Sequence, residues 1–247
     1  MDACGKFWQS AGASDTGLVR DHNEDSLLDR SDLGLWVVAD GMGGHSSGDL
    51  ASQTLCSELS KLPGHLSLAD AVDFVDDTCL LINDQLVELA TQRGRGTVIG
   101  TTVVALVARQ NTAICLWAGD SRLYRLRGGT IEQISQDHSY LSQPEQEEHP
   151  EVAATHGHII TRAVGAATEL HLDLEAVQLA EGDRYLLCSD GLTNELNLEN
   201  LQQVLSQGSA EECCQRLVEQ AVTAGGRDNI TALVADFGLS RSEQATE

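Results

Sequence analysis

Acidic residues placed directly after apolar runs are the part of this sequence best suited to chemistry. The segments "LWVVADG", "CLWAGDS" and "YLLCSDG" each run through apolar residues into an aspartate followed by a small residue, which places three aspartates at predicted strand ends. Two further acidic positions, in "RDHNED" and "GGRDN", lie beside small or polar turn residues. The resulting candidate set is Glu24, Asp25, Asp40, Asp120, Asp190 and Asp228.

These acids predict a site for hard divalent cations. A single such aspartate is usually a turn residue or a helix cap, but the repeated pattern favours a shared role. Clustered carboxylates raise one another's pKa, so they cannot all ionise without a cation. Oxygen ligands without His or Cys neighbours select Mg²⁺ or Mn²⁺ rather than zinc. Gly41 would let its own carbonyl approach such an ion, and the glycines after Asp40 leave room for ions and a phosphate.

Composition and motifs disfavour several other functions. The chain of 247 residues carries 38 Asp and Glu against 15 Lys and Arg, which gives a net charge of −23. Because so acidic a surface repels nucleic acid and anionic lipid, no nucleic-acid partner is expected. The stretch "GMGGHSSG" lacks the G-K-[ST] ending of a P-loop, and the chain has no G-x-S-x-G elbow, so a nucleotide cradle and a serine hydrolase are both poor alternatives.

Cysteine usage and the N-terminal segment predict a cytoplasmic protein. The seven cysteines include no C-x-x-C pair and are expected to be reduced. The segment "MDACGKFWQSAG" has neither the basic region nor the long apolar stretch of a signal peptide. No run approaches the roughly 20 apolar residues that a membrane helix needs, so no membrane association is expected.

Periodicity predicts the elements that must position the acids. Apolar residues at helical spacing indicate two pairs of helices, at 46–61 with 68–92 and at 197–207 with 209–224. Four strands between residues 101 and 135 follow one another through turns too short for parallel crossovers, which predicts an antiparallel meander and excludes a doubly wound nucleotide fold for this half. Strands in runs with helices in pairs indicate one layered α+β domain.

The order of the motifs resembles one known family. The segments are "GLVRDHNED", "VVADGMGGHSSGDLAS", "GTTVVAL", "AGDSRLYRLR", "SQDHS", "ITRAVG", "LLCSDGL" and "GGRDNIT", and they span about residues 11 to 238. Together they resemble the PPM family, the metal-dependent Ser/Thr protein phosphatases of the protein phosphatase 2C type, in its compact bacterial form. Any one segment is a weak signal, whereas the full set in this order is highly specific.

The resemblance implies a fold and a division into parts. It implies an α+β four-layer α-β-β-α sandwich, in which two antiparallel sheets are flanked by helical hairpins. It also implies a single domain over residues 1–238, with a flap beside the active site at about 139–160. The remaining residues, 239–247, are expected to form a short disordered tail.

The resemblance also implies roles for the candidate residues. Asp40 would bridge two ions of Mn²⁺ or Mg²⁺, and the Gly41 carbonyl would bind one of them. Glu24 would serve that same ion with Asp25 in support, and Asp190 and Asp228 would hold the other. Asp120, with Asp190, corresponds to a weaker third site. Arg20 would bind the substrate phosphate, its alternative role being a surface salt bridge with Asp21 or Glu24.

The implied reaction is hydrolysis of phosphoserine and phosphothreonine in proteins, by direct in-line attack of a metal-bridging hydroxide. Met42 stands where many eukaryotic members have a histidine, so the proton donor to the leaving group is open between a metal-bound water and His45. His138 is expected to hold a loop. The expected partners are phosphorylated proteins, among them a Ser/Thr kinase and its substrates, and the expected state is a monomer. The alternative is a catalytically silent fold that binds phosphoproteins as a regulator.

Overall fold

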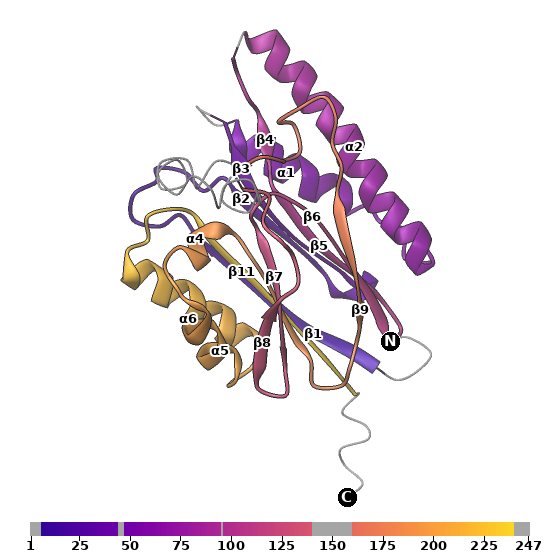
Figure 1. Ribbon diagram of the computed structural model, residues 1–247, viewed down its shortest axis with the longest axis vertical. Coiled ribbons are helices and arrows are strands. Elements are labelled where there is room, and N and C mark those ends of the chain that lie inside the picture. Colours follow the sequence, from indigo (N-terminus) through magenta and orange to yellow (C-terminus); the bar gives the residue numbers. More distant parts are fainter. Residues whose placement is uncertain (1–5, 44–46, 95, 140–159, 240–247) are drawn as a thin grey trace, which may run out of the picture.

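The computed structural model describes residues 6–43, 47–94, 96–139 and 160–239 (Figure 1). The predicted flap, except for its two end residues, and the predicted tail after residue 239 lie outside the described residues. Within the described part, no helix is both long enough and apolar enough to span a bilayer.

The strands are β1 Lys6–Asp15, β2 Asp25–Arg30, β3 Leu35–Met42, β4 Gly100–Thr101, β5 Val103–Arg109, β6 Thr112–Ala118, β7 Arg122–Arg127, β8 Thr130–Gln133, β9 Asp173–Gln178, β10 Arg184–Cys188 and β11 Ile230–Leu239. The helices are the short η1 Ser31–Leu33 and α1 Gly48–Leu59, α2 Leu68–Arg93, α4 Asp190–Thr193, α5 Leu198–Leu205 and α6 Ala210–Ala224.

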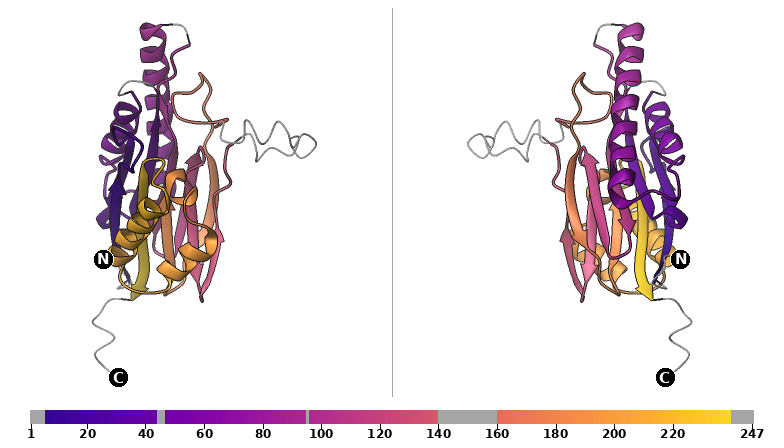
Figure 2. Two further views of the ribbon diagram at one scale, coloured as in Figure 1. Left: turned by 90° about the vertical axis from the view of Figure 1, so that its left-hand side faces the viewer. Right: turned by 90° about the vertical axis from the view of Figure 1, so that its right-hand side faces the viewer.

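The strands form two antiparallel sheets. One sheet has the order β1-β11-β10-β7-β8, and the other has the order β2-β3-β5-β6-β9, with β4 paired to β3. The two sheets lie face to face, with helices on the outer side of each (Figures 1 and 2). The predicted α+β four-layer sandwich is therefore confirmed.

Alternation along β3 shows how the sequence specifies these layers. Leu35 and Val37 belong to the apolar cluster under α1 and α2, whereas Trp36 and Val38 belong to the cluster between the two sheets. Successive side chains of a strand point to opposite faces, so a strand covered on both sides reads as a continuous apolar run. A third cluster lies between the other sheet and helices α4, α5 and α6.

The predicted helices agree closely with α1, α2, α5 and α6. Three of these helices, α2, α5 and α6, begin at a side-chain cap: the side chain of Ser67 accepts a hydrogen bond from the backbone N–H of Asp70 at the start of α2. Reciprocal capping boxes begin α5 at Asn197 and α6 at Ser209. These helices lie in the outer layers, and the capping residues next to them in the sequence specify where each helix begins.

The predicted meander is wrong at one step. Strands β5 and β6 pair in one sheet and β7 and β8 pair in the other, so the chain changes sheets between β6 and β7. The turn that makes this change contains Gly119, with φ of +118°, a conformation that favours glycine. An added Cβ at Gly119 would lie 2.6 Å from the side chain of Thr102. This change of sheet carries Asp120 to the end of the sandwich where Asp40 lies.

Candidate active site

A cleft of 660 Å³ contains most of the predicted site residues. The residues that form its walls come from the end of β3, from the loop before β2, from the turn between β6 and β7, from α4 and the residues after it, and from the turn before β11. Among the predicted residues, the cleft is lined by Arg20, Glu24, Asp40, Gly41, Asp120, Asp190 and Asp228. Asp25, the cross-strand partner of Asp40 in the β2–β3 pair, is buried and does not line the cleft.

The backbone of Asp40 is held by two consecutive threonines. Its N–H donates to Oγ1 of Thr102 at 2.9 Å, and its carbonyl accepts from the N–H of Thr102 at 2.8 Å and from Oγ1 of Thr101 at 3.0 Å. The Thr102 hydroxyl also lies 2.7 Å from that of Ser121, in the turn that follows Asp120. This network links the backbone positions of two candidate ligands that are 80 residues apart in the sequence.

Asp25 is a buried carboxylate with an unsatisfied oxygen. Its Oδ2 accepts hydrogen bonds from Ser189 Oγ and Thr231 Oγ1, each at 2.7 Å, while its Oδ1 is buried without a partner. Burial raises the pKa of this carboxyl to about 7, although the two hydroxyl groups act in the opposite direction. The charges on Asp190 and Asp228 add to the rise.

Asp120 and Asp40 also have raised pKa values. Burial raises the pKa of Asp120 to about 7, and Asp120 Oδ1 is also buried without a hydrogen-bond partner. The pKa of Asp40 lies well above its ordinary value because the carboxyl is buried and because four other aspartates surround it. Negative charge therefore accumulates at this end of the sandwich, and only a cation would let all of these groups ionise.

Gly41 has no room for a side chain. A Cβ at this position would lie 2.1 Å from the carbonyl oxygen of Gly48 and 2.6 Å from that of Glu24. Its N–H donates to the Glu24 carbonyl at 3.1 Å, and the Ser52 hydroxyl donates to the same oxygen at 2.6 Å. Glycine at position 41 thus lets β3, α1 and the loop before β2 meet at the cleft.

Arg20 pairs with Asp228. Its guanidinium Nη2 donates to Asp228 Oδ2 at 2.8 Å, and both side chains are partly exposed. This hydrogen bond raises the pKa of Arg20. The alternative prediction of a salt bridge to Asp21 or Glu24 therefore named the wrong partner. The loop places Arg20 beside Asp228, the acid that precedes β11. The pair joins the expected phosphate ligand to an expected metal ligand.

The side chains fit divalent cations in chemistry, although they do not yet enclose one. Across the residues that the structure describes, no three His, Cys, Asp or Glu groups converge closely enough to hold an ion as they stand. Asp228 is bonded to Arg20, and Asp190 Oδ2 accepts from Asn194 Nδ2 at 3.1 Å. Asp25 and Asp120 nevertheless each have a buried carboxyl oxygen without a hydrogen-bond partner, so the site lacks positive charge near them. All of the candidate ligand atoms are oxygens, which suits Mg²⁺ or Mn²⁺.

Asn229 is a site residue that the sequence did not reveal. Its Nδ2 donates to the carbonyls of Thr16 and His22 at 2.9 Å each, and its Oδ1 accepts from the N–H of Glu24 at 2.8 Å. It thereby fastens the loop of residues 16–24, which carries Arg20, to the start of β11. Its position directly after Asp228 in "GGRDN" was the available signal, but nothing in the sequence indicates where an amide side chain points.

His138 has the predicted structural role. Its Nδ1 accepts from the N–H of Gly119 at 3.2 Å, its backbone N–H donates to the Gly119 carbonyl at 2.8 Å, and its Nε2 lies 3.1 Å from Asp173 Oδ2. Burial lowers the pKa of the imidazole. The ring supports the turn before Asp120 and does not line the cleft. His45, the open candidate for a proton donor, lies outside the described residues.

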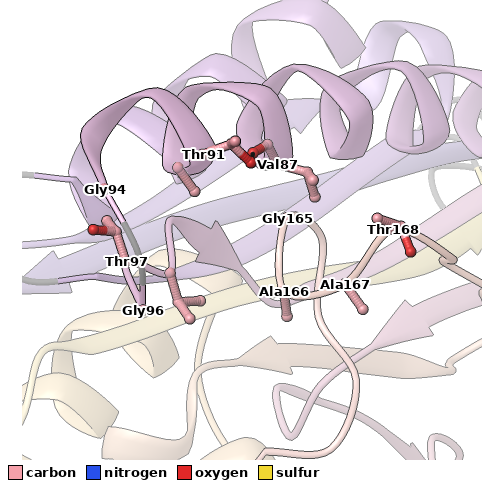
Figure 3. Close-up of a pocket in the computed structure, with 11 residues that line it drawn as sticks. Val87, Thr91, Gly94, Gly96, Thr97, Gly165, Ala166, Ala167 and Thr168 are labelled. Carbon is pink, nitrogen blue, oxygen red and sulfur yellow. Dashed lines mark hydrogen bonds between the residues drawn. The ribbon is translucent and has the colours of Figure 1, made fainter.

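A second hollow lies away from these acids. It has a volume of 350 Å³ and is bounded by the C-terminal turns of α2, by residues 96–98 and by residues 165–168 (Figure 3). Its lining consists of glycine, alanine, threonine and valine. Among the residues that the structure describes, no titratable side chain lines this hollow, so they offer it neither metal ligands nor a general acid or base.

The raised pKa values predict how the metal-free protein responds to pH. Asp120 holds its proton up to about pH 7 in the folded state and releases it near pH 4 when unfolded, so stability falls as pH rises between these values and then levels off. One such group contributes up to about 1.4 kcal/mol per pH unit. In thermal unfolding with a chelator, we expect a lower Tm at pH 7.5 than at pH 5.5. Asp120→Asn should reduce that difference in Tm, whereas the surface substitution Asp32→Asn should not. An equal difference in Tm for the unmodified protein and both variants would contradict this prediction.

Known proteins share this sequence and fold. Residues 19–228 match the family described as protein phosphatase 2C. The solved structure of PppA, a key regulatory component of T6SS in Pseudomonas aeruginosa, is 43% identical, with a TM-score of 0.88 over 94% of this chain and 98% of that one. The catalytic domain of the Ser/Thr protein phosphatase PstP, solved with two manganese ions, is 35% identical, with a TM-score of 0.81 over 94% of this chain and 99% of that one.

Two relatives compared by sequence alone also match most of this chain. The Ser/Thr phosphatase stp of Listeria monocytogenes is 31% identical over 245 residues, covering 92% of this chain and 95% of its own length. PstP of Mycobacterium tuberculosis is 35% identical over 230 residues, covering 92% of this chain but 44% of PstP, so this chain spans less than half of that relative. Matches over most of the domain, in sequence and in fold, show that the chain belongs to the protein phosphatase 2C family of metal-dependent Ser/Thr protein phosphatases.

Proposed function

We propose that this protein hydrolyses phosphoserine and phosphothreonine esters in proteins with the help of two divalent cations, Mn²⁺ or Mg²⁺. The observation that carries the proposal is the gathering of five predicted acidic ligands around one cleft, with a sixth, Asp25, buried beside Asp40 as its cross-strand partner. The manganese ions in the PstP catalytic domain and the names of the relatives support the same reaction.

Each acidic residue has a part in holding the ions. Asp40 is central because its carboxyl interacts with all the other aspartates of the set. Glu24 and the Gly41 carbonyl would complete one ion's ligands, with Asp25 in support behind them. Asp190 and Asp228 would hold the second ion, and Asp120 with Asp190 could hold a weaker third.

Arg20 would then exchange its partner. If Asp228 were a ligand of an ion, its carboxylate would no longer be available to the guanidinium, and Arg20 would be free to make two parallel hydrogen bonds to phosphate oxygens. When bound, the ions supply an activated water and stabilise the charge that develops in an in-line displacement. The chain's own contribution is to orient the ester through Arg20 and to hold its acidic side chains in place.

The substrates would be phosphorylated proteins, and we propose a Ser/Thr kinase and its targets as the opposing partners. The similarity to PppA, a regulatory component of T6SS, supports a regulatory role of this kind. We propose in addition that the protein acts as a monomer in the cytoplasm. A regulator that binds phosphoproteins without turnover is disfavoured because every predicted acidic ligand lines the cleft or, in the case of Asp25, is buried beside Asp40.

Release of inorganic phosphate from a phosphothreonine peptide and from p-nitrophenyl phosphate, in Mn²⁺, tests the proposal. Turnover of both substrates is expected. Binding of the peptide without release of phosphate would instead support the silent regulator.

Asn229 provides a more specific prediction. Asn229→Ala removes three hydrogen bonds that fix the loop bearing Arg20, so we expect a loss of about 1–3 kcal/mol in unfolding free energy and a clear rise in KM for p-nitrophenyl phosphate. Asn83→Ala is the matched control, because the buried Asn83 amide likewise bonds a loop, at Gly165 and Ala167. The control should lose stability with little change in KM. Equal KM values in the two variants would refute a specific role for Asn229.

A further inference from the structure

The loop that carries Arg20 also presents two large apolar side chains to solvent. Leu18 is 69% exposed and Val19 is 66% exposed, more than any other large apolar residue that the structure describes, the next being Leu174 at 60%. Exposed apolar residues are common singly. Here, two of them are adjacent in the sequence and immediately precede the proposed phosphate ligand.

Their exposure is not the result of a loosely held loop. Gly17 has φ of +79°, and a Cβ there would lie 2.3 Å from the carbonyl oxygen of Asp228, so the backbone packs tightly against the turn before β11. The N–H of Leu18 donates to the Gly226 carbonyl at 2.7 Å, and the Asn229 amide bonds the loop at both ends. The fold therefore holds the two apolar side chains at fixed positions in water.

The position of the pair relates it to the cleft. Leu18 lies over Gly226, where an added Cβ would come within 3.1 Å of Leu18 Cγ. The next residue after that glycine, Arg227, lines the cleft, as does Arg20 on the other side of the pair. Leu18 and Val19 therefore lie beside the cleft, next to the place where a bound phosphate ester would enter.

We propose that Leu18 and Val19 bind an apolar side chain two residues from the phosphorylated residue of the protein substrate, and so help to select the substrate. This inference rests on the proposed phosphatase function and deepens it. The cleft itself is polar and recognises the phosphate, which every substrate shares. In an extended peptide, alternate side chains point to the same face and lie about 7 Å apart along the chain, so the residue two positions from the phosphorylated one reaches the rim while the phosphate lies in the cleft. Burial of apolar surface against the pair would favour a leucine or valine over a serine there.

The test compares phosphothreonine peptides that differ only at the positions two residues from the phosphothreonine. One peptide has serine at both of these positions, a second has leucine at the N-terminal one, and a third has leucine at the C-terminal one. With Mn²⁺ present, we expect the protein to have a KM about tenfold lower for one of the leucine peptides than for the serine peptide. The variant with Leu18→Ser and Val19→Thr should bring this ratio close to one. Leu81→Ser, which changes an apolar residue on α2 that is 56% exposed, should keep the preference.

The outcomes separate this inference from the function on which it rests. Turnover of all three peptides with equal KM, or a preference that persists in the double variant, overturns the inference and leaves the phosphatase function intact. Failure of the unmodified protein to hydrolyse any peptide or p-nitrophenyl phosphate overturns both. If the double variant does not fold, as judged by thermal unfolding, Val19→Thr alone preserves the shape and should still reduce the preference. A change of oligomeric state in the double variant without a change in the KM ratio would mean that the pair contacts a second copy instead.

Discussion

Asp40→Asn is expected to lower kcat/KM for p-nitrophenyl phosphate by about a thousandfold or more, because it weakens the binding of both proposed ions at once. The same change should raise the Tm of the metal-free protein. Asp40 is buried among like charges that raise its pKa, so its ionised form destabilises the fold near neutral pH, and an uncharged amide removes that cost.

The matched control is Asp29→Asn, which makes the same substitution in β2, beside β3 and away from the cleft. Asp29 accepts a hydrogen bond from Ser10 and should tolerate the change with activity preserved. Lost activity combined with higher metal-free stability is a pattern that general damage to the fold does not produce. Activity near that of the unmodified protein in Asp40→Asn would remove Asp40 from the proposed centre.

Arg20→Lys is expected to reduce kcat/KM by about 10- to 100-fold, because a lysine cannot make two parallel hydrogen bonds to a phosphate group. Inhibition by inorganic phosphate should weaken in parallel, since the same contacts bind the free anion. The measurement is the KM and the phosphate inhibition constant in Mn²⁺.

Arg30→Lys provides the comparison for this variant. Arg30 also makes paired hydrogen bonds to an aspartate, Asp32, but it lies at the far end of β2 from the cleft. Its substitution should leave phosphate inhibition unchanged. If Arg20→Lys bound phosphate as tightly as the unmodified protein, Arg20 would be no more than the salt-bridge partner of Asp228.

Much of the architecture and the site followed from the sequence, for physical reasons. Strands covered on both faces are continuous apolar runs, and "LWVVAD" could be assigned to a buried strand on that ground. An acid at the end of such a strand is costly unless something pairs with it, which made Asp40, Asp120 and Asp190 conspicuous. The structure brings these acids to one cleft together with Glu24 and Asp228.

Features that depend on long-range pairing did not follow from the sequence. Short turns showed that β6 and β7 are consecutive, but not that Gly119 directs them into different sheets. No prediction was made for β1, which pairs with β11 over ten residues at the opposite end of the chain. The partner of Arg20 was missed for the same reason, because Asp228 is 208 residues away along the chain.

The most direct test of the two-ion phosphatase is hydrolysis of p-nitrophenyl phosphate and of a phosphothreonine peptide in Mn²⁺, in Mg²⁺ and in a chelator, with Asp190→Asn beside the unmodified protein. We expect turnover of both substrates that requires the ion, is lost in the chelator, returns when the ion is restored, and is abolished in Asp190→Asn. Absence of turnover in a folded protein that binds Mn²⁺ would contradict it, as would turnover that persists in the chelator.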